Sequence, residues 1–285
     1  LMLTFGSLIM GCRSTKDYAG LAQAGTTYVA AMNSLLVATG NIGIDATSEK
    51  LLQDDALSNQ SLELYKNLSD EDEKMLKVIS QLRQHVNLLG QYFELLHDLA
   101  NSDAPGRAQQ AIGNSDSGLI GNLNKVGNQL RGSGFIPSTV SAATVPITNA
   151  VVSGIIRGAL KDELQLRKDT IQKELFLQEQ LLSALSDKIN HDLTITQQSK
   201  EQRLVIGPLT SPTPIANPDT WINNRRSALT IKLTAEQLQT ASNNIKKLRH
   251  AFDDLMTGKL TFANVNSLLA DFNTLLTIAE KLKGQ

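Results

Sequence analysis

The longest regular pattern of hydrophobic and polar positions runs from Val151 to about Gln198. Its apolar residues recur at steps of three, four or seven, which places them on one stripe of a single helix. They are Val152, Ile156, Leu160, Leu164, Ile171, Leu175, Leu182, Leu185, Ile189 and Leu193. At roughly 1.5 Å per residue, this helix extends about 70 Å. A stripe of that length needs long partner helices, so we expect the rest of the chain to be organised around it.

Two helical segments are predicted near the N-terminus. Ser14 to about Ala38 carries apolar residues at alternating steps of three and four, with small residues that allow close helix packing. Gly40 and Gly43 weaken that pattern, and a second helical segment covers roughly Ser48 to Leu68. The pattern leaves open whether the second segment continues the first.

Ser69 is the predicted N-cap of the next helix, with the acidic residues 70–73 in its first turn. The helix dipole favours negative charge there, so capping explains this acidic run better than a cation site. The helix continues with the most regular seam in the chain, at strict four-three steps. Its members are Met75, Ile79, Leu82, Val86, Leu89, Phe93, Leu96 and Ala100.

A proline-rich loop over 205–218 is predicted to end the long helix. Asn217 suits an N-cap, and Pro218 suits the first position of the following helix. That helix should end at Gly258, and Thr261 should cap the last one. The seam changes phase between these two helices, so the pattern predicts a helical hairpin.

These segments together predict an all-α protein, an elongated antiparallel coiled-coil-like bundle of about five or six helices. We expect residues 1–11 to be the remnant of a signal peptide and residues 12–285 to form a single helical bundle domain. Within it, 106–150 is a connecting region that is first Gly-rich and, from 132 on, uncharged. Aromatic residues make up 4% of the chain, which suits thin helical seams better than a thick mixed core.

Charge and cysteine content narrow the function further. The net charge is −1, so electrostatics gives no case for nucleic-acid binding. The single cysteine, Cys12, cannot form an internal disulfide, and no Cys/His spacing suggests a metal site. We therefore predict no cofactor and no metal.

The first residues form an apolar run, Leu1 to Met10, that is too short to span a bilayer and is typical of the hydrophobic part of a secretory signal. Leu8-Ile9-Met10-Gly11-Cys12 resembles the bacterial lipobox, with an aliphatic residue three before the cysteine and a small residue just before it. The resemblance implies cleavage before Cys12, lipid attachment to that residue, and stable anchoring on the membrane of a bacterial cell envelope. Arg13, where some lipoproteins carry Asp, favours the outer membrane or cell surface.

A stretch without charged residues covers 132–156. One interpretation is a buried connection at one end of the bundle. The other is an apolar tip that contacts a membrane, although two prolines and many Ser, Thr and Asn residues argue against a transmembrane helix. The candidate membrane-contact residues are Phe135, Ile136, Val151, Val152, Ile155 and Ile156.

No catalytic motif is present in the sequence. His191-Asp192 is interpreted as a solvated surface pair, and Asp253, four residues after Arg249, as its partner in a helix-surface ion pair. The remaining histidines are His85, His97 and His250. An enzyme with a site assembled from scattered acidic and histidine residues is the least favoured interpretation.

The sequence thus predicts a non-enzymatic envelope lipoprotein that acts as a scaffold, a spacer or a partner-binding helical module. Its expected partners are the membrane, through the lipid anchor, and a protein. The alternative is a membrane-active protein whose architecture resembles that of α-helical pore-forming toxins and which uses 132–156.

Overall fold

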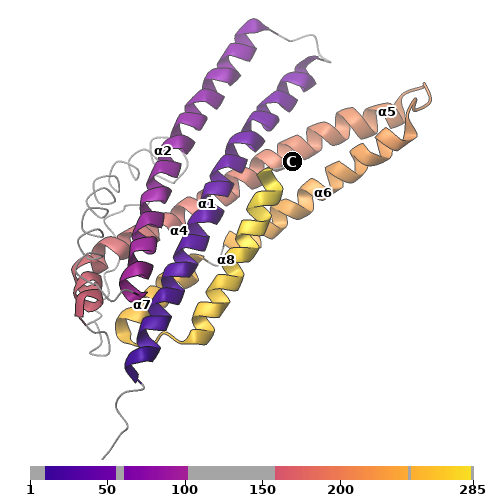
Figure 1. Cartoon of the computed structure of the whole chain (residues 1–285). Helices are drawn as coiled ribbons and strands as arrows, with labels where there is room; N and C mark the ends of the chain where they lie inside the picture. The colour runs from indigo at the N-terminus through magenta and orange to yellow at the C-terminus, as the bar shows by residue number, and fades with distance from the viewer. Residues whose placement is uncertain (1–9, 56–60, 102–157, 243–244, 284–285) are drawn as a thin grey trace, which may run out of the picture.

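The structure, a computed structural model, describes residues 10–55, 61–101, 158–242 and 245–283 (Figure 1). In chain order its elements are α1 (Met10–Asp55), α2 (Leu62–Asn101), α4 (Gly158–Glu201), the π-helix η1 (Gln202–Ile206), α5 (Gly207–Thr210), α6 (Pro218–Ser242), α7 (Ile245–Thr257) and α8 (Phe262–Lys283). Within these ranges six helices, from α7 with 13 residues to α1 with 46, build an elongated bundle. The predicted all-α fold is confirmed.

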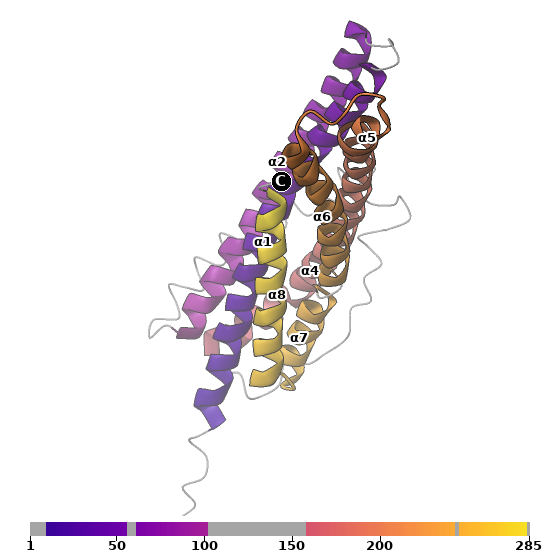
Figure 2. The same ribbon diagram turned by 90° about the vertical axis from the view of Figure 1, so that its right-hand side faces the viewer.

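α1, α4 and α8 share one direction, and α2, α6 and α7 run opposite to it (Figure 1). Contacts along α1 show this: Gly20 lies against Val265 near the start of α8, and Ser34 bonds to Glu280 near its end. The partners of α1 in α4 advance in the same way, from Gln178 to Arg203. Figure 2 shows α8 between the α1–α2 hairpin and the α4–α6 hairpin. α1 therefore packs against two helices of its own direction, α4 and α8, and against the antiparallel α2.

The central element is α1 and not the long helix after Val151, which corrects the sequence-based expectation. α1 packs against α2, α4, α7 and α8 and is buried along most of its length. No charged residue occurs between Asp17 and Asp45, so this segment tolerates contacts on several faces. α4 keeps one face in solvent, because its stripe is flanked by charged residues.

The first predicted N-terminal segment continues into the second, since α1 runs through Gly40 and Gly43 as far as Asp55. The rest of the second segment, predicted to reach Leu68, does not belong to α1: 56–60 lie outside the described residues, and 62–68 begin α2. At Gly43 the Met75 side chain of α2 occupies the space that a Cβ atom would need, and at Gly40 the end of the Leu76 side chain lies 3.0 Å from that position. Close packing of α1 on α2 therefore compensates for the low helix propensity of glycine.

The predicted N-cap at Ser69 is wrong. α2 begins at Leu62, and the Ser61 hydroxyl accepts a hydrogen bond from the Leu64 amide at 3.0 Å, which is the capping interaction. Residues 70–73 therefore lie inside the helix, where Asp72 accepts a hydrogen bond from Thr47 of α1 at 2.8 Å. Acidic residues are acceptable helix formers at exposed positions, so the charged run does not start a helix.

The long helix also extends beyond its predicted end, because η1 and α5 continue α4 as far as Thr210. The predicted loop 205–218 shortens to 211–217. Pro208 lies in the first turn of α5, where the fixed φ of proline suits the helix. The indole of Trp221 in α6 donates a hydrogen bond to the Val205 carbonyl at 3.0 Å and so satisfies one acceptor of the π-helix. The first residues of the predicted helix, 151–157, lie outside the described residues.

The predicted caps of the C-terminal helices are confirmed, although the single helix predicted from Pro218 to Gly258 is two elements, α6 and α7. The Asn217 side chain accepts a hydrogen bond from the Thr220 amide at 3.0 Å, directly before Pro218. Gly258 has a φ of 71°, the left-handed conformation that ends α7 at little cost. Thr261 accepts from the Asn264 amide at 3.2 Å and caps α8.

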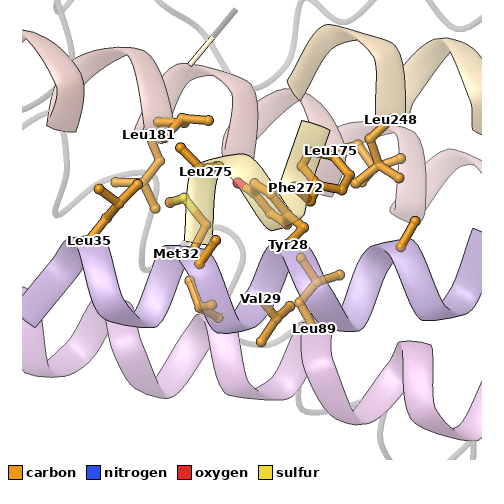
Figure 3. Close-up of a cluster of buried hydrophobic side chains, with 14 of the residues drawn as sticks. Tyr28, Val29, Met32, Leu35, Leu89, Leu175, Leu181, Leu248, Phe272 and Leu275 are labelled. Carbon is orange, nitrogen blue, oxygen red and sulfur yellow. The ribbon is translucent and has the colours of Figure 1, made fainter. Parts of the chain in front are cut away.

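The hydrophobic core lies where α1, α2, α4, α7 and α8 meet (Figure 3). Tyr28 of α1 packs against Phe272 of α8, with ring centroids 5.3 Å apart. Leu89 of α2 and Leu175 of α4 are fully or almost fully buried in the same cluster. The stripes predicted for α2 and α4 thus meet around α1, and burial of these side chains supplies the main driving force for folding.

A first prediction tests the close approach of α1 and α2. A Cβ atom added at Gly25 would lie 2.4 Å from the Phe93 ring, so Gly25→Ala should destabilise the protein by about 1–3 kcal/mol in urea unfolding.

Gly40→Ala is the matched control. Its Cβ would meet the end of the Leu76 side chain at 3.0 Å, and Leu76 is 41% exposed and free to move. Because alanine is favoured over glycine in helices by up to about 1 kcal/mol, Gly40→Ala should be neutral or stabilising. The predicted packing is wrong if the two variants are equally stable.

Candidate functional site

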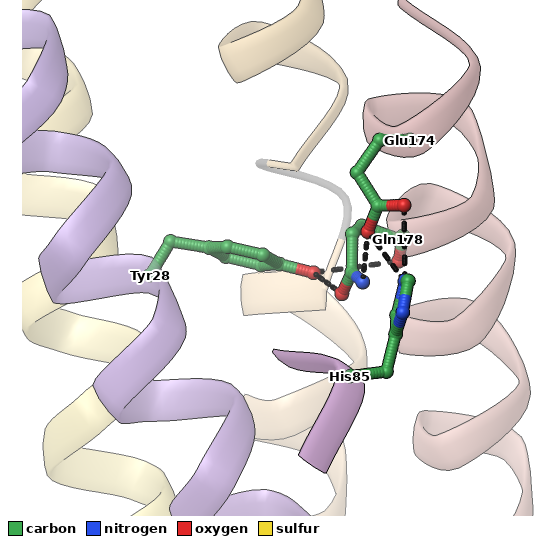
Figure 4. A network of polar contacts seen from close by, with 4 residues as sticks. All are labelled: Tyr28, His85, Glu174 and Gln178. Atoms are coloured by element: carbon green, nitrogen blue, oxygen red, sulfur yellow. Dashed lines mark hydrogen bonds and ion pairs between the residues drawn. The ribbon is translucent and has the colours of Figure 1, made fainter. Parts of the chain in front are cut away.

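The most distinctive chemical feature is a polar network buried in the core between α1, α2 and α4 (Figure 4). Nε2 of His85 lies 2.9 Å and 3.0 Å from the two carboxylate oxygens of Glu174. Gln178, one turn further along α4, donates to Glu174 Oε1 at 2.7 Å and accepts from the Tyr28 hydroxyl at 3.1 Å. His85 and Glu174 are 1% and 0% exposed, so solvent does not reach the pair.

The charges of this network depend on one another. Burial lowers the pKa of His85, but the charge of Glu174 and the hydrogen bond to it outweigh that effect, so the pKa lies above the ordinary 6.5. Burial, together with the Glu174 charge, also raises the pKa of Tyr28 well above its usual range. Below the raised pKa of His85, the network therefore holds a protonated imidazole against a carboxylate, with a neutral phenol beside them. Among the described residues, Nδ1 of His85 has no hydrogen-bond partner.

A second buried carboxylate, Glu163, lies near the start of α4. It bonds to Arg167 one turn later and is 1% exposed. Burial raises its pKa to about 7 even with this cation beside it. Burial likewise raises the pKa of Tyr92, and the Glu163 charge raises it further. Glu163 is therefore a group whose ionisation opposes folding near neutral pH.

Ion pairs join the helices further out and correct two sequence-based interpretations. Arg249 pairs with Glu179 of α4 at 3.1 Å and not with Asp253, whose carboxylate accepts from Gln172 at 2.7 Å. His191 is exposed, but Asp192 next to it is buried at 3% exposure and pairs with Lys188. Asp253 and Asp192 each face a neighbouring helix. His191 faces solvent beside Asp192, because adjacent residues of a helix point in different directions. The polar groups of α4 thus serve its packing.

Arg203 of the π-helix forms an ion pair with Glu49 near the end of α1, 154 positions away in the sequence. The guanidinium contacts both carboxylate oxygens, at 2.8 Å and 3.0 Å. Glu49 is 6% exposed, so the carboxylate of this bidentate pair is shielded from solvent, whereas the Arg203 side chain is 37% exposed. It holds the far part of α1 against the α4–α6 hairpin.

An open cleft of about 600 Å³ lies beside these pairs, between α1, α2 and α4. Gly43 and Met75 contribute to its lining, and the Lys188–Asp192 pair borders it. Lys50, Glu71 and Lys74 add further charges of both signs. The cleft has no excess of one charge and no buried group without a partner, so it does not define a ligand class.

The sequence-predicted site residues fall mostly outside these features. Cys12 lies in the first turns of α1, and its side chain is outside the described residues. The candidate membrane-contact residues, all between 135 and 156, also lie outside the described residues. The sequence analysis missed the His85–Glu174 pair, because the two residues are 89 positions apart. The sequence carried one signal of this pair: His85 directly precedes Val86, which belongs to the predicted seam of α2.

In the described part of the chain, no group of three or more His, Cys, Asp and Glu side chains is arranged to hold a metal ion. None of the described helices combines the length and apolarity needed to cross a membrane. Comparisons with models of protein families, with curated proteins and with solved structures found no match.

The electrostatics of His85 gives a second prediction. Because its pKa is raised above 6.5, the pair contributes its full stabilisation below about pH 6.5, and this contribution is lost as the pH rises through the raised value. His85→Gln should cost on the order of 3 kcal/mol below that pH, since it leaves Glu174 buried without a cation. The cost should shrink at higher pH, as measured by urea unfolding across a pH series.

His191→Gln, which changes an exposed histidine, is the matched control and should follow the unsubstituted protein at every pH. The raised pKa of Glu163 adds a loss of stability between about pH 4.5 and about pH 7 in all three proteins, so it cancels in the difference. A cost of His85→Gln that does not change with pH would contradict a protonated His85.

Proposed function

We propose that the chain is a non-enzymatic lipoprotein of a bacterial cell envelope, in which a lipid on Cys12 holds a helical scaffold at the membrane and the free end of the α1–α2 hairpin binds a protein partner. The lipid anchor rests on the lipobox-like residues 8–12. The partner-binding role rests on exposed apolar side chains at that free end.

The observation that carries the partner-binding role is the exposure of Leu62 and Tyr65, at 69% and 56%. Both lie in the first turns of α2, where the hairpin extends past the other helices (Figure 1). Leu52, near the end of α1, is 44% exposed. Apolar side chains exposed at the end of a rigid arm are typical of a protein-interaction surface, because their burial by a partner is favourable.

A scaffold role also agrees with the chemistry of the core. The imidazole and carboxylate of the His85–Glu174 pair are bonded to each other and almost completely buried, so a substrate cannot reach either group. Charged groups between α1 and the long helix, such as Glu49 and Arg203, likewise bind one another. These contacts make the arms rigid, which is the property a spacer needs. They support a structural role over a catalytic one.

The anchor gives a third prediction. Cys12→Ala should move the full chain from the membrane fraction to the soluble fraction of the cells, because the site of lipid attachment is lost. Cys12→Ala protein that stays in the membrane fraction would contradict the anchor. Its release by a further Val152→Asp substitution would then favour the alternative membrane-active function, which the uncharged stretch 132–156 supports.

The interaction surface gives a fourth prediction. A photo-crosslinking residue at position 69, on the half-exposed side of α2 near the hairpin end, should give a defined adduct in cells. Leu62→Ser combined with Tyr65→Ser should abolish that adduct while leaving the melting temperature within a few degrees. Leu166→Ser, which changes a leucine 73% exposed on α4, is the matched control and should keep the adduct. An adduct unaffected by the double substitution would contradict this surface.

A further inference from the structure

A second pocket, of about 400 Å³, lies between α1, α4 and α6. Its volume is within the range of small-molecule sites, roughly 300–1,000 Å³. Ile42, Leu193 and Ile231 give it an apolar part. The polar residues that line it are Asp45, Thr196, Lys200, Asn223, Arg226, Ser227 and Thr230.

Thr196 is the most informative of these residues. Its side chain is 3% exposed, and its hydroxyl has no hydrogen-bond partner among the described residues. Other helical threonines satisfy their hydroxyl by donating to the carbonyl four residues earlier. They include Thr39, Thr194, Thr230, Thr274 and Thr277. A buried hydroxyl without a partner is costly, so one at a pocket wall indicates that a ligand group completes it.

The charged residues indicate which ligand group this is. Lys200 is half-buried and takes part in no ion pair within the described ranges. Arg226 donates to Asn223 at 3.2 Å and is otherwise exposed toward solvent, so most of its donors remain available. Two cations against one carboxylate, Asp45, leave the pocket with an excess of positive charge. A lysine, an arginine and a hydroxyl together are suited to a carboxylate or phosphate oxyanion.

We propose that this pocket binds a small solute through a phosphate or carboxylate oxyanion, which accepts hydrogen bonds from Thr196, Lys200 and Arg226. The apolar side chains of Ile42 and Ile231 contact the rest of the solute. Because its walls come from three helices, the ligand joins α1 to the α4–α6 hairpin. This inference is independent of the lipid anchor and of the partner surface at the α1–α2 end.

The experiment measures thermal unfolding of the full chain with Cys12→Ala, at constant ionic strength, with increasing inorganic phosphate or succinate. Both anions should raise the melting temperature above that in chloride, because they bind the folded state. Neutral glycerol at the same low concentrations should not. Lys200→Gln and Arg226→Gln should each weaken the fitted dissociation constant at least about tenfold.

Two further variants separate binding from folding. Thr196→Val should weaken anion binding while leaving the ligand-free protein at least as stable, because it removes an unpaired buried hydroxyl. Lys66→Gln changes an exposed lysine of α2 far along the chain from the pocket and should bind as the parent does. The proposal is overturned if neither anion stabilises the protein beyond chloride. It is equally overturned if Lys66→Gln weakens binding as much as Lys200→Gln, or if Thr196→Val binds unchanged.

Discussion

The enclosure of α1 by α2, α4 and α8 is the constraint on which the rest of the structure depends. A helix covered on several faces has little contact with water, so its side chains must be uncharged, and some must be small where two helices approach closely. Gly25 against Phe93 and Gly20 against Val265 show how closely the neighbouring helices approach. α4 and α8 run parallel to α1 and complete its enclosure.

Polar groups inside this packing fix its alignment. An apolar seam tolerates a slip of one helical turn, because leucine replaces leucine. The network of Tyr28, His85, Glu174 and Gln178 does not tolerate such a slip, since it would leave a buried charge without its partner. The Glu49–Arg203 pair sets the same alignment further along the molecule. Hydrophobic burial therefore stabilises the bundle, and these few bonds select one arrangement of it.

Local sequence pattern was enough to predict the fold class, the seams of α2 and α4, and the caps at Asn217 and Thr261. It was not enough to tell which helix is the central one, because the enclosure of α1 follows from its lack of charged residues and not from its periodicity. Ser69 was wrongly chosen as a cap because the acidic residues after it resemble a first turn. The buried network and the pocket at Thr196 depend on residues that are distant in sequence, and helical spacing carries no information about them.

The π-helix between α4 and α5 has a consequence for the tolerance of this region to insertions and deletions. A π-turn contains one residue more than an α-helical turn, so it has the form of a single inserted residue absorbed without breaking the helix. Removing one residue from 202–206 would restore the ordinary repeat and leave everything beyond it close to its present direction. Leu209 would then keep its place, and the change would be confined to the turn whose Val205 carbonyl accepts the Trp221 indole. The length of this segment is therefore less restricted than that of the regular part of α4, where one deletion rotates everything beyond it by about 100°.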